Sequence, residues 1–243
     1  MTQSFEENFR KELDILSIDL KKNQINEFYK YYELLIEWNK FMNLTTIVEE
    51  GEVITKHFVD SLSLVKAVDE IGSKDIKIID VGTGAGFPGI PLIIAFPELR
   101  ITLMDSLNKR VKFLNEVIET LELKNINAIH GRAEDLGKDP THREAYDLCV
   151  SRAVANLNTL SEYCMPFVKK GGYFIPYKSG KIEEEVGAAK HAIFLLGGRV
   201  EEVKTFLLPG TEVERSLVKI NKISNISKRY PRKAGLPTKE PLN

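Results

Sequence analysis

A glycine-rich stretch that follows a short β-branched run constrains the fold of this chain more than any other feature. Residues 76–81 are mainly isoleucine and valine, and Gly82, Gly84 and Gly86 follow them at every second position. The next apolar residues, 90–96, recur at helical spacing. A strand that enters a glycine-rich turn and then a helix is typical of a βαβ unit, in which the ligand lies beside that turn. The stretch therefore predicts a parallel sheet with a ligand site next to it.

Strand and helix patterns alternate along the rest of the chain. The runs with strand character are residues 76–81, 101–104, 126–129, 146–150 and 173–177, and the helical patterns are residues 90–96, 111–123, 157–168 and 182–196. Gly171 and Gly172 are expected to form a turn before the fifth strand. Two further extended runs flank Pro209-Gly210, which predicts an antiparallel pair at the sheet edge. This order predicts an α/β fold with a doubly wound, mostly parallel sheet.

The first 72 residues show helical patterns and no strong strand. Apolar residues recur at spacings of three and four within residues 5–16, 25–38 and 53–68, whereas residues 39–46 are polar and expected to be irregular. We therefore expect an N-terminal helical extension, residues 1–72, packed on an α/β domain of residues 73–243.

Composition narrows the class of protein. A hydrophobic content of 43% is ordinary for a globular chain, and no apolar run has membrane-spanning length. The polar, acid-containing N-terminus is unlike a secretory signal. Cys149 and Cys164 lie among apolar residues and are expected to be core thiols in a reducing cytoplasm. The histidines are scattered and no His/Cys cluster has metal-ligand spacing, so neither a metal nor a membrane partner is expected.

The glycine stretch discriminates between two classes of ligand. Gly84, Gly86 and Gly89 match the dinucleotide fingerprint G-x-G-x-x-G, but a single match of that kind is weak. Asp80 ends the strand, where its carboxylate would repel a pyrophosphate. S-adenosylmethionine has no phosphate, and a carboxylate can hold its ammonium group directly or through water. The spacing Asp80-x-Gly82-x-Gly84-x-Gly86 therefore resembles motif I of the class I methyltransferases.

Acidic residues also follow the next two predicted strands. Asp105 ends the second strand, about 20 residues further on, where a carboxylate can accept hydrogen bonds from both ribose hydroxyls. Glu134 follows the third strand, where methyltransferases of this class contact the adenine. Taken singly, Asp105 is also compatible with a helix N-cap and Glu134 with a solvated loop. Together with the glycine loop after the first strand, these two acids make three signals, each at the end of its own strand, and they favour an S-adenosylmethionine site.

The class of methyl acceptor is indicated mainly by catalytic motifs that the sequence lacks. Residues 150–154 stand where many amino-group methyltransferases carry an Asp/Asn-Pro-Pro-aromatic box, which disfavours exocyclic amines. Carbon methylation of cytosine needs a thiolate, usually after a proline, whereas Cys149 follows Leu148 and Cys164 lies on an apolar helix. No histidines pair into an acid–base set. A nucleophile that needs no deprotonation fits these residues.

Basic residues gather at the C-terminal end of a chain whose net charge is −1. Such a cluster is compatible with an anionic partner or with a solvated tail. Pro231 and Pro237 resist helix formation and predict an extended surface segment. The residues expected to contact RNA phosphates are Lys228, Arg229, Arg232 and Lys233.

Several motifs occur in one unbroken order between about residues 38 and 242. They are Trp38-Asn39-x-x-x-Asn43-Leu44-Thr45, His57-Phe58-Val59-Asp60-Ser61-Leu62, the loop from Asp80 to Pro91, Asp105-Ser106-x-x-Lys109-Arg110, Arg132-Ala133-Glu134, Ser151-Arg152-Ala153 and Arg229-Tyr230-Pro231-Arg232-Lys233-x-Gly235-x-Pro237. Together they resemble the RsmG (GidB) family, which comprises bacterial small-subunit (16S) ribosomal RNA guanine-N7 methyltransferases. The resemblance implies a Rossmann-like class I methyltransferase fold.

The resemblance also implies roles for particular residues. Those implied to bind the cofactor, S-adenosyl-L-methionine, are Asp80, Gly82, Gly84, Gly86, Phe87, Asp105, Ser106, Leu107, Ala133, Glu134 and Arg152. Arg152 is the candidate catalytic residue, because it is expected to close the site against the cofactor or the target base, although a structural salt bridge is the alternative. Asp60 is a candidate for favouring the cationic methylated base, or for capping a helix.

The implied chemistry agrees with the missing acid–base set. Guanine N7 has a free lone pair and can attack the sulfonium methyl without a general base, so the protein positions and desolvates the reactants. The implied partner is small-subunit ribosomal RNA or a ribosomal particle. The alternatives are another acceptor (a different RNA position, a protein or a small molecule) and a non-catalytic RNA-binding module. The cofactor residues favour an enzyme, and the basic C-terminus favours RNA.

Overall fold

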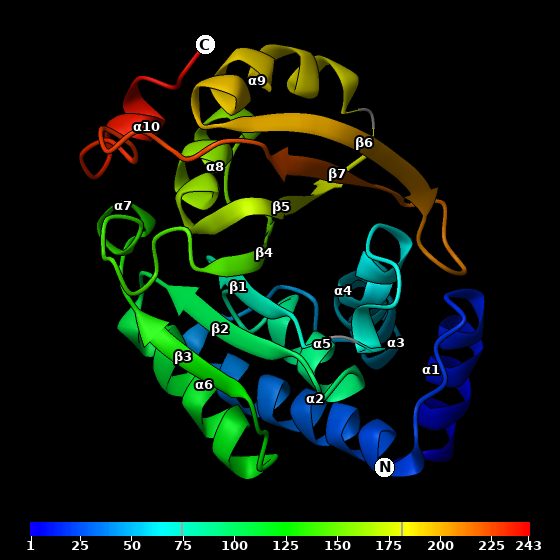
Figure 1. Ribbon diagram of the computed structural model, residues 1–243. Coiled ribbons are helices and arrows are strands. Elements are labelled where there is room, and N and C mark those ends of the chain that lie inside the picture. The colour runs from blue at the N-terminus through cyan, green and yellow to red at the C-terminus, as the bar shows by residue number, and fades with distance from the viewer. Residues whose placement is uncertain (74, 181) are drawn as a thin grey trace.

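One seven-stranded sheet crosses the computed structural model, which describes residues 1–73, 75–180 and 182–243 (Figure 1). Its strands are β1 (Lys77–Val81), β2 (Arg100–Asp105), β3 (Ile126–His130), β4 (Tyr146–Arg152), β5 (Val168–Ser179), β6 (Gly198–Leu207) and β7 (Glu214–Lys222). Their order is β3-β2-β1-β4-β5-β7-β6. The first five are parallel, whereas β7 pairs antiparallel with β5 and β6. The predicted doubly wound sheet with an antiparallel edge pair is confirmed.

Helices cover both faces of this sheet. They are α1 (Gln3–Ile15), α2 (Lys22–Met42), α3 (Glu50–Val53), α4 (Asp60–Leu62), α5 (Gly89–Ala95), α6 (Asn108–Thr120), α7 (Ala133–Leu136), α8 (Leu157–Cys164), α9 (Glu183–Leu195) and α10 (Leu236–Lys239). A π-helical segment, η1 (Ile54–Val59), and three 3₁₀ segments, η2 (Ser63–Lys66), η3 (Ile71–Ser73) and η4 (Met165–Phe167), complete them. None of the helices in the described ranges is long and apolar enough to cross a membrane.

Successive residues of a strand belong to hydrophobic clusters on opposite faces of the sheet. Ile78 belongs to a hydrophobic cluster with α1, α2, α5 and α6, and its neighbour Ile79 belongs to a cluster with α8 and α9. Figure 1 shows α2 and α6 on one side of the sheet and α8 and α9 on the other. Within the first cluster, Phe9 packs against Phe28 and Phe58 with ring centroids 4.8 and 6.0 Å apart. The helices of the N-terminal part therefore share a core with the sheet.

The expected irregular stretch at residues 39–46 is partly wrong, because α2 continues to Met42 and ends where Asn43 adopts a left-handed conformation. Tertiary packing explains the extra turn. The Trp38 ring lies 5.4 Å from that of Phe41 and 5.6 Å from that of Phe113 on α6. These contacts outweigh the polar character of the local sequence.

The expected turn at Gly171-Gly172 is also wrong, because β5 begins at Val168 and runs through both glycines. Val168 pairs with Tyr146 of β4, but Tyr173 pairs with Leu148, so the two strands change register at this point. The irregularity absorbs the additional residues within the strand, and a glycine with φ +84° at position 171 permits it.

Candidate active site

Two adjoining cavities lie at the carboxyl ends of the central strands. The first, of about 730 Å³, is lined by Gly82, Gly84, Phe87 and Arg152, and we call it the Arg152 cavity. The second, of about 340 Å³, is lined by residues after β2 and β3, including Glu134, and we call it the Glu134 cavity. Gly82 lines both cavities. They open beside the point between β1 and β4 where the strand order reverses, the usual ligand position in such sheets.

The glycine loop takes its shape from positive φ angles and from α2. Gly82, Gly84 and Gly86 have φ values of +72°, +63° and +103°, which side chains rarely adopt. A Cβ atom at Gly86 would come within 2.8 Å of the Tyr31 hydroxyl, whereas one at Gly84 would meet nothing within 4 Å. The Tyr31 hydroxyl donates a 2.5 Å hydrogen bond to the carbonyl oxygen of Ala85. No motif indicates this role for Tyr31, since its position in the helical pattern fits an ordinary core aromatic.

Asp80 lies beneath the loop and lines neither cavity. Its side chain is fully buried, and Oδ2 accepts hydrogen bonds from Thr83 Oγ1 at 2.7 Å and from the Gly89 amide at 2.9 Å. Burial raises the pKa of Asp80 to about 7. This placement does not support direct contact with a cofactor ammonium. The carboxylate instead joins the end of β1 to the start of α5 and so fixes the loop between them.

Asp105 connects the end of β2 to the glycine loop. Only 2% of this residue is exposed, and its Oδ2 accepts from the Gly84 amide at 3.0 Å and from Arg110 at 3.3 Å. Oδ1 accepts from the Leu107 amide at 2.9 Å. Ser106 and Leu107 line the Glu134 cavity. Asp105 thus lies at the predicted strand end, and its contact with a ribose remains a prediction.

Glu134 lies in the wall of the second cavity, beside Ala133. Its Oε1 accepts a 2.9 Å hydrogen bond from the amide of Gly235, a residue 101 positions later in the chain. Gly235 and Tyr163 line the same cavity. Tyr163 is not among the expected site residues, and Gly235 is expected only as part of the C-terminal motif, because no local motif shows that the C-terminal end returns to this part of the sheet.

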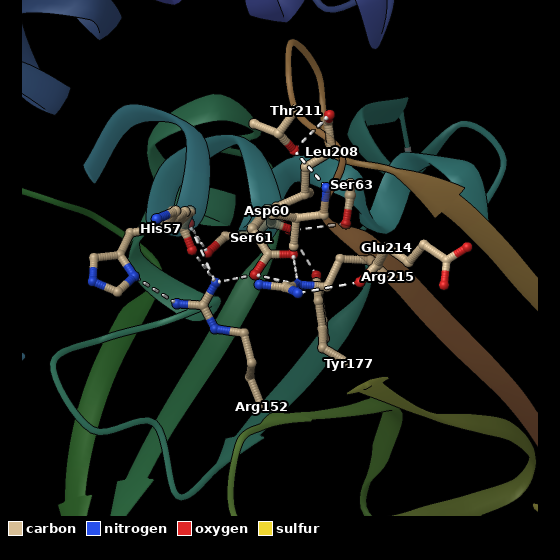
Figure 2. A network of polar contacts seen from close by, with 12 residues as sticks. His57, Asp60, Ser61, Ser63, Arg152, Tyr177, Leu208, Thr211, Glu214 and Arg215 are labelled. Atoms are coloured by element: carbon tan, nitrogen blue, oxygen red, sulfur yellow. Dashed lines mark hydrogen bonds and ion pairs between the residues drawn. The ribbon is translucent and has the colours of Figure 1, made fainter. Parts of the chain in front are cut away.

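Arg152 and Arg215 share one buried carboxylate, that of Asp60 (Figure 2). Asp60 is 1% exposed, and its Oδ2 lies 2.9 Å from Arg152 Nη1 while its Oδ1 lies 3.2 Å from Arg215 Nε. The guanidinium carbon of Arg152 also lies 5.0 Å from the centre of the Phe87 ring. Arg152 therefore makes the salt bridge that was the alternative expectation, and it also lines the cavity as predicted. Arg215 was missed.

The contacts of Asp60 correct both roles expected for it. Its oxygens bind two guanidinium groups, so the side chain is not a free carboxylate that faces a cationic base. No capping hydrogen bond from its side chain is among the described contacts of α4. Asp60 instead holds Arg152 and Arg215 at the edge of the cavity.

His57 is a neutral part of this wall. Its ring stacks on Phe87 with centroids 4.4 Å apart, its Nε2 lies 2.9 Å from Thr45 Oγ1, and its Nδ1 lies 3.4 Å from Arg152. Desolvation, followed by the charge of Arg152, lowers the pKa of His57 to about 3. Arg152 also donates to the carbonyls of Lys56 and His57, which belong to the π-helical segment η1, at 3.3 and 3.5 Å.

The predicted RNA-contact residues fall into two groups. Lys228, Arg229 and Lys233 are exposed. Arg232 instead forms an ion pair with the fully buried Glu162, at 2.7 Å between Nη2 and Oε2. Its guanidinium is therefore occupied by a contact within the chain. The segment is also not simply extended, since it contains the short helix α10.

The two cysteines lie in the core and away from the cavities. Cys149 and Cys164 are buried free thiols, as predicted. Within residues 1–73, 75–180 and 182–243, no group of three or more His, Cys, Asp or Glu side chains is arranged to hold a metal ion.

Comparison with known proteins identifies the family. A family model described as GidB, rRNA small subunit methyltransferase G, matches residues 24–218. The chain belongs to this family.

Curated relatives cover nearly all of the chain. A ribosomal RNA small subunit methyltransferase G from Lachnoclostridium phytofermentans is 58% identical over 227 residues, which is 93% of each chain. One from Alkaliphilus metalliredigens is 51% identical over 93% of this chain and 94% of its own. The predicted relationship to this family is therefore confirmed.

Solved structures confirm the fold class. M. jannaschii TYW2 in complex with AdoMet superposes with a TM-score of 0.52 at 17% identity, over 68% of this chain and 77% of its own. A putative sarcosine dimethylglycine methyltransferase from Galdieria sulphuraria superposes with a TM-score of 0.54 at 13% identity, over 73% and 89%. At these identities the likeness concerns the fold alone.

Proposed function

We propose that this protein transfers the methyl group of S-adenosyl-L-methionine to N7 of a guanine in small-subunit ribosomal RNA. The observation that carries the proposal is the pair of adjoining cavities at the carboxyl ends of β1, β2 and β4. One is built around the glycine loop and the other around Glu134, and Gly82 belongs to both. A ligand with an amino-acid end and a nucleoside end fits two such cavities joined at a glycine.

The residues of the two cavities fit this cofactor. Because no protein atom lies within 4 Å of a Cβ built at Gly84, the space over the loop is open to the methionine end. Ser106, Leu107 and Ala133 line the space proposed for the adenosine, and the neighbouring Asp105 accepts hydrogen bonds from the Gly84 and Leu107 amides. The bound cofactor supplies an electrophilic methyl group on a sulfonium.

The side chains of the Arg152 cavity position an acceptor rather than deprotonate it. His57 has a pKa of about 3 and is neutral near pH 7, and both oxygens of Asp60 are paired with arginines. Guanine N7 needs no base, since its lone pair is free at neutral pH. Phe87, with Arg152 over its ring, provides a rigid wall against which a base can be aligned and shielded from water.

Exposed cations supply the proposed contacts to RNA. Lys228, Arg229 and Lys233 are exposed and have no ion pair among the described contacts. Arg215 and Lys178, which line the Arg152 cavity, are instead paired with Asp60 and Glu185. Phosphate contacts of this kind orient RNA without reading its sequence. Ribosomal RNA, either free or in an assembling particle, places the proposed activity in the cytoplasm.

The proposal is tested by offering labelled S-adenosylmethionine and purified protein to three acceptors: small ribosomal subunits from a deletion strain, the naked small-subunit RNA, and total cell protein. We expect label in 7-methylguanine of the RNA, in one or both RNA samples. Label in protein, or in another base, would replace guanine N7 with a different acceptor. Binding of RNA without any binding of S-adenosylmethionine would favour the non-catalytic RNA-binding module.

A further inference from the structure

Gly235 of the C-terminal segment, residues 226–240, lines the Glu134 cavity, and four basic side chains of the segment, Lys228, Arg229, Lys233 and Lys239, are exposed. We propose that this segment completes the cofactor site and couples it to RNA binding, with Arg232 as the positioning residue. The inference rests on the proposed function, because it assumes that the Glu134 cavity receives the cofactor.

Arg143 fastens the beginning of the segment. Its Nη1 donates to the carbonyl of Tyr230 at 2.8 Å, and its Nη2 donates to those of Ile226 and Ser227, both at 3.1 Å. Tyr230 is 4% exposed and belongs to the hydrophobic cluster of α8 and α9. The segment is therefore a docked part of the core rather than a solvated tail.

Arg232 fastens the middle of the segment to α8. Its Nε and Nη2 donate to Glu162 at 2.9 and 2.7 Å, and its backbone amide donates to the same carboxylate at 2.7 Å. Glu162 is 0% exposed. A two-point pair of this kind has a fixed geometry, so it sets the path of the chain that follows.

That path leads directly into the cavity wall. Three residues after Arg232, the Gly235 amide donates to Glu134 Oε1 at 2.9 Å. The Tyr163 hydroxyl, whose residue lines the same cavity, lies 2.7 Å from Thr238 Oγ1. Both the orientation of Glu134 and that of Tyr163 thus depend on how the segment docks.

The same segment presents Lys228, Arg229 and Lys233 to solvent on both sides of Arg232 in the sequence. An RNA phosphate bound to these cations would hold the segment in its docked position. A docked segment in turn holds Glu134 and Tyr163 in place for the cofactor. Because coupling free energies are reciprocal, the cofactor must then strengthen RNA binding by the same factor.

The test measures the affinity for S-adenosylhomocysteine, the unreactive product, by equilibrium dialysis with and without an excess of small ribosomal subunits from a deletion strain. For the parent protein we expect the subunits to tighten binding by about fivefold or more. Arg232→Gln should weaken binding about tenfold without subunits and remove most of the tightening, since the buried Glu162 loses its partner. The control is Arg100→Gln, which removes an exposed ion pair with Asp75 away from both cavities and should change neither value.

A second variant tests the coupling without disturbing a buried group. The triple change Lys228→Gln, Arg229→Gln and Lys233→Gln alters only exposed side chains, so the segment should stay docked and binding without subunits should match the parent. The tightening by subunits should disappear. Equal tightening in the triple variant and the parent, or parent-like affinity in a folded Arg232→Gln protein, would overturn the inference. If the inference is overturned in this way but the parent protein still methylates RNA, the proposed function stands. If the parent protein does not bind the cofactor, the inference and the proposed function both fail.

Discussion

At the scale of single residues, Arg152 combines two functions that the sequence analysis treated as alternatives. It pairs with Asp60 at 2.9 Å and lies over Phe87 in the cavity wall. Arg152→Ala leaves Asp60 paired with Arg215, so the fold should survive. Because misplaced reactants can lose about 100-fold in rate, we expect single-turnover methylation to fall by about that factor. Near-normal turnover with a lower melting temperature would show that Arg152 is only structural.

Asp60→Asn, unlike Arg152→Ala, should mainly lower the stability of the fold. The substitution removes the negative charge that two guanidiniums share in a buried position, and breaking such a pair costs about 3–5 kcal/mol. We expect a large decrease in the free energy of unfolding, measured by urea denaturation. A variant as stable as the parent would mean that Arg152 and Arg215 find other partners.

His57 gives a prediction about pH. Its pKa in the folded protein is about 3, below the ordinary value of 6.5. Between these values the unfolded chain binds a proton that the folded protein does not, so stability contributed by neutral His57 is present above pH 6.5 and is lost as pH falls. The loss is up to about 1.4 kcal/mol per pH unit. Urea unfolding at pH 5 and 7 should therefore show a smaller difference for His57→Gln than for the parent. Equal differences would contradict the low pKa.

Gly84 and Gly210 form a matched pair for testing the cofactor loop. Both have positive φ, +63° and +69°, and neither has a protein atom within 4 Å of a built Cβ. Valine should therefore strain the backbone similarly at both positions. Only Gly84→Val should weaken S-adenosylmethionine binding, by about tenfold or more, because only its side chain would enter the Arg152 cavity. Calorimetry that finds equal affinity for the two variants would remove Gly84 from the site.

At the scale of elements, α2 takes part in the site although it precedes β1, the first strand of the sheet, in sequence. Tyr31 on this helix donates to the Ala85 carbonyl of the glycine loop. Tyr31→Phe should cost about 1 kcal/mol of stability and should weaken cofactor binding several-fold, because the loop loses its support. Tyr29→Phe on the same helix is the control, since Tyr29 packs on Phe5 away from both cavities. Equal cofactor affinity in the two variants would contradict this role.

The succession of strands and helices along the chain could be predicted from sequence, because short β-branched or aromatic runs alternate with segments of helical spacing. The limits of α2 and β5 could not, since packing of Trp38 on Phe113 and the register change opposite Tyr146 are tertiary effects. The apolar spacing of residues 53–68 predicts a helix, but the structure divides this stretch at η1. Apolar spacing does not distinguish an α-turn from a π-turn, so the pattern could not show that residues 54–59 are π-helical.

At the scale of the whole molecule, the site is assembled from segments that are distant in the chain. Strand-end signals located the loop, Asp105 and Glu134, because they follow the strands directly. Arg215 on β7 and Gly235 beyond it reach the two cavities only through the fold, so no spacing indicated them. The same reasoning explains why Arg232 was grouped with the exposed cations: its charge is visible in the sequence, but its partner Glu162 is 70 residues away.

The most direct test of the account is a mass measurement of nucleosides from small-subunit ribosomal RNA. RNA from a strain lacking this gene is compared with RNA from the same strain carrying the parent gene or its Gly84→Val variant. We predict that one 7-methylguanosine is absent from the deletion strain, is restored by the parent gene, and is restored poorly by the variant. An unchanged 7-methylguanosine content in the deletion strain, with or without loss of another modification, would contradict the proposed reaction.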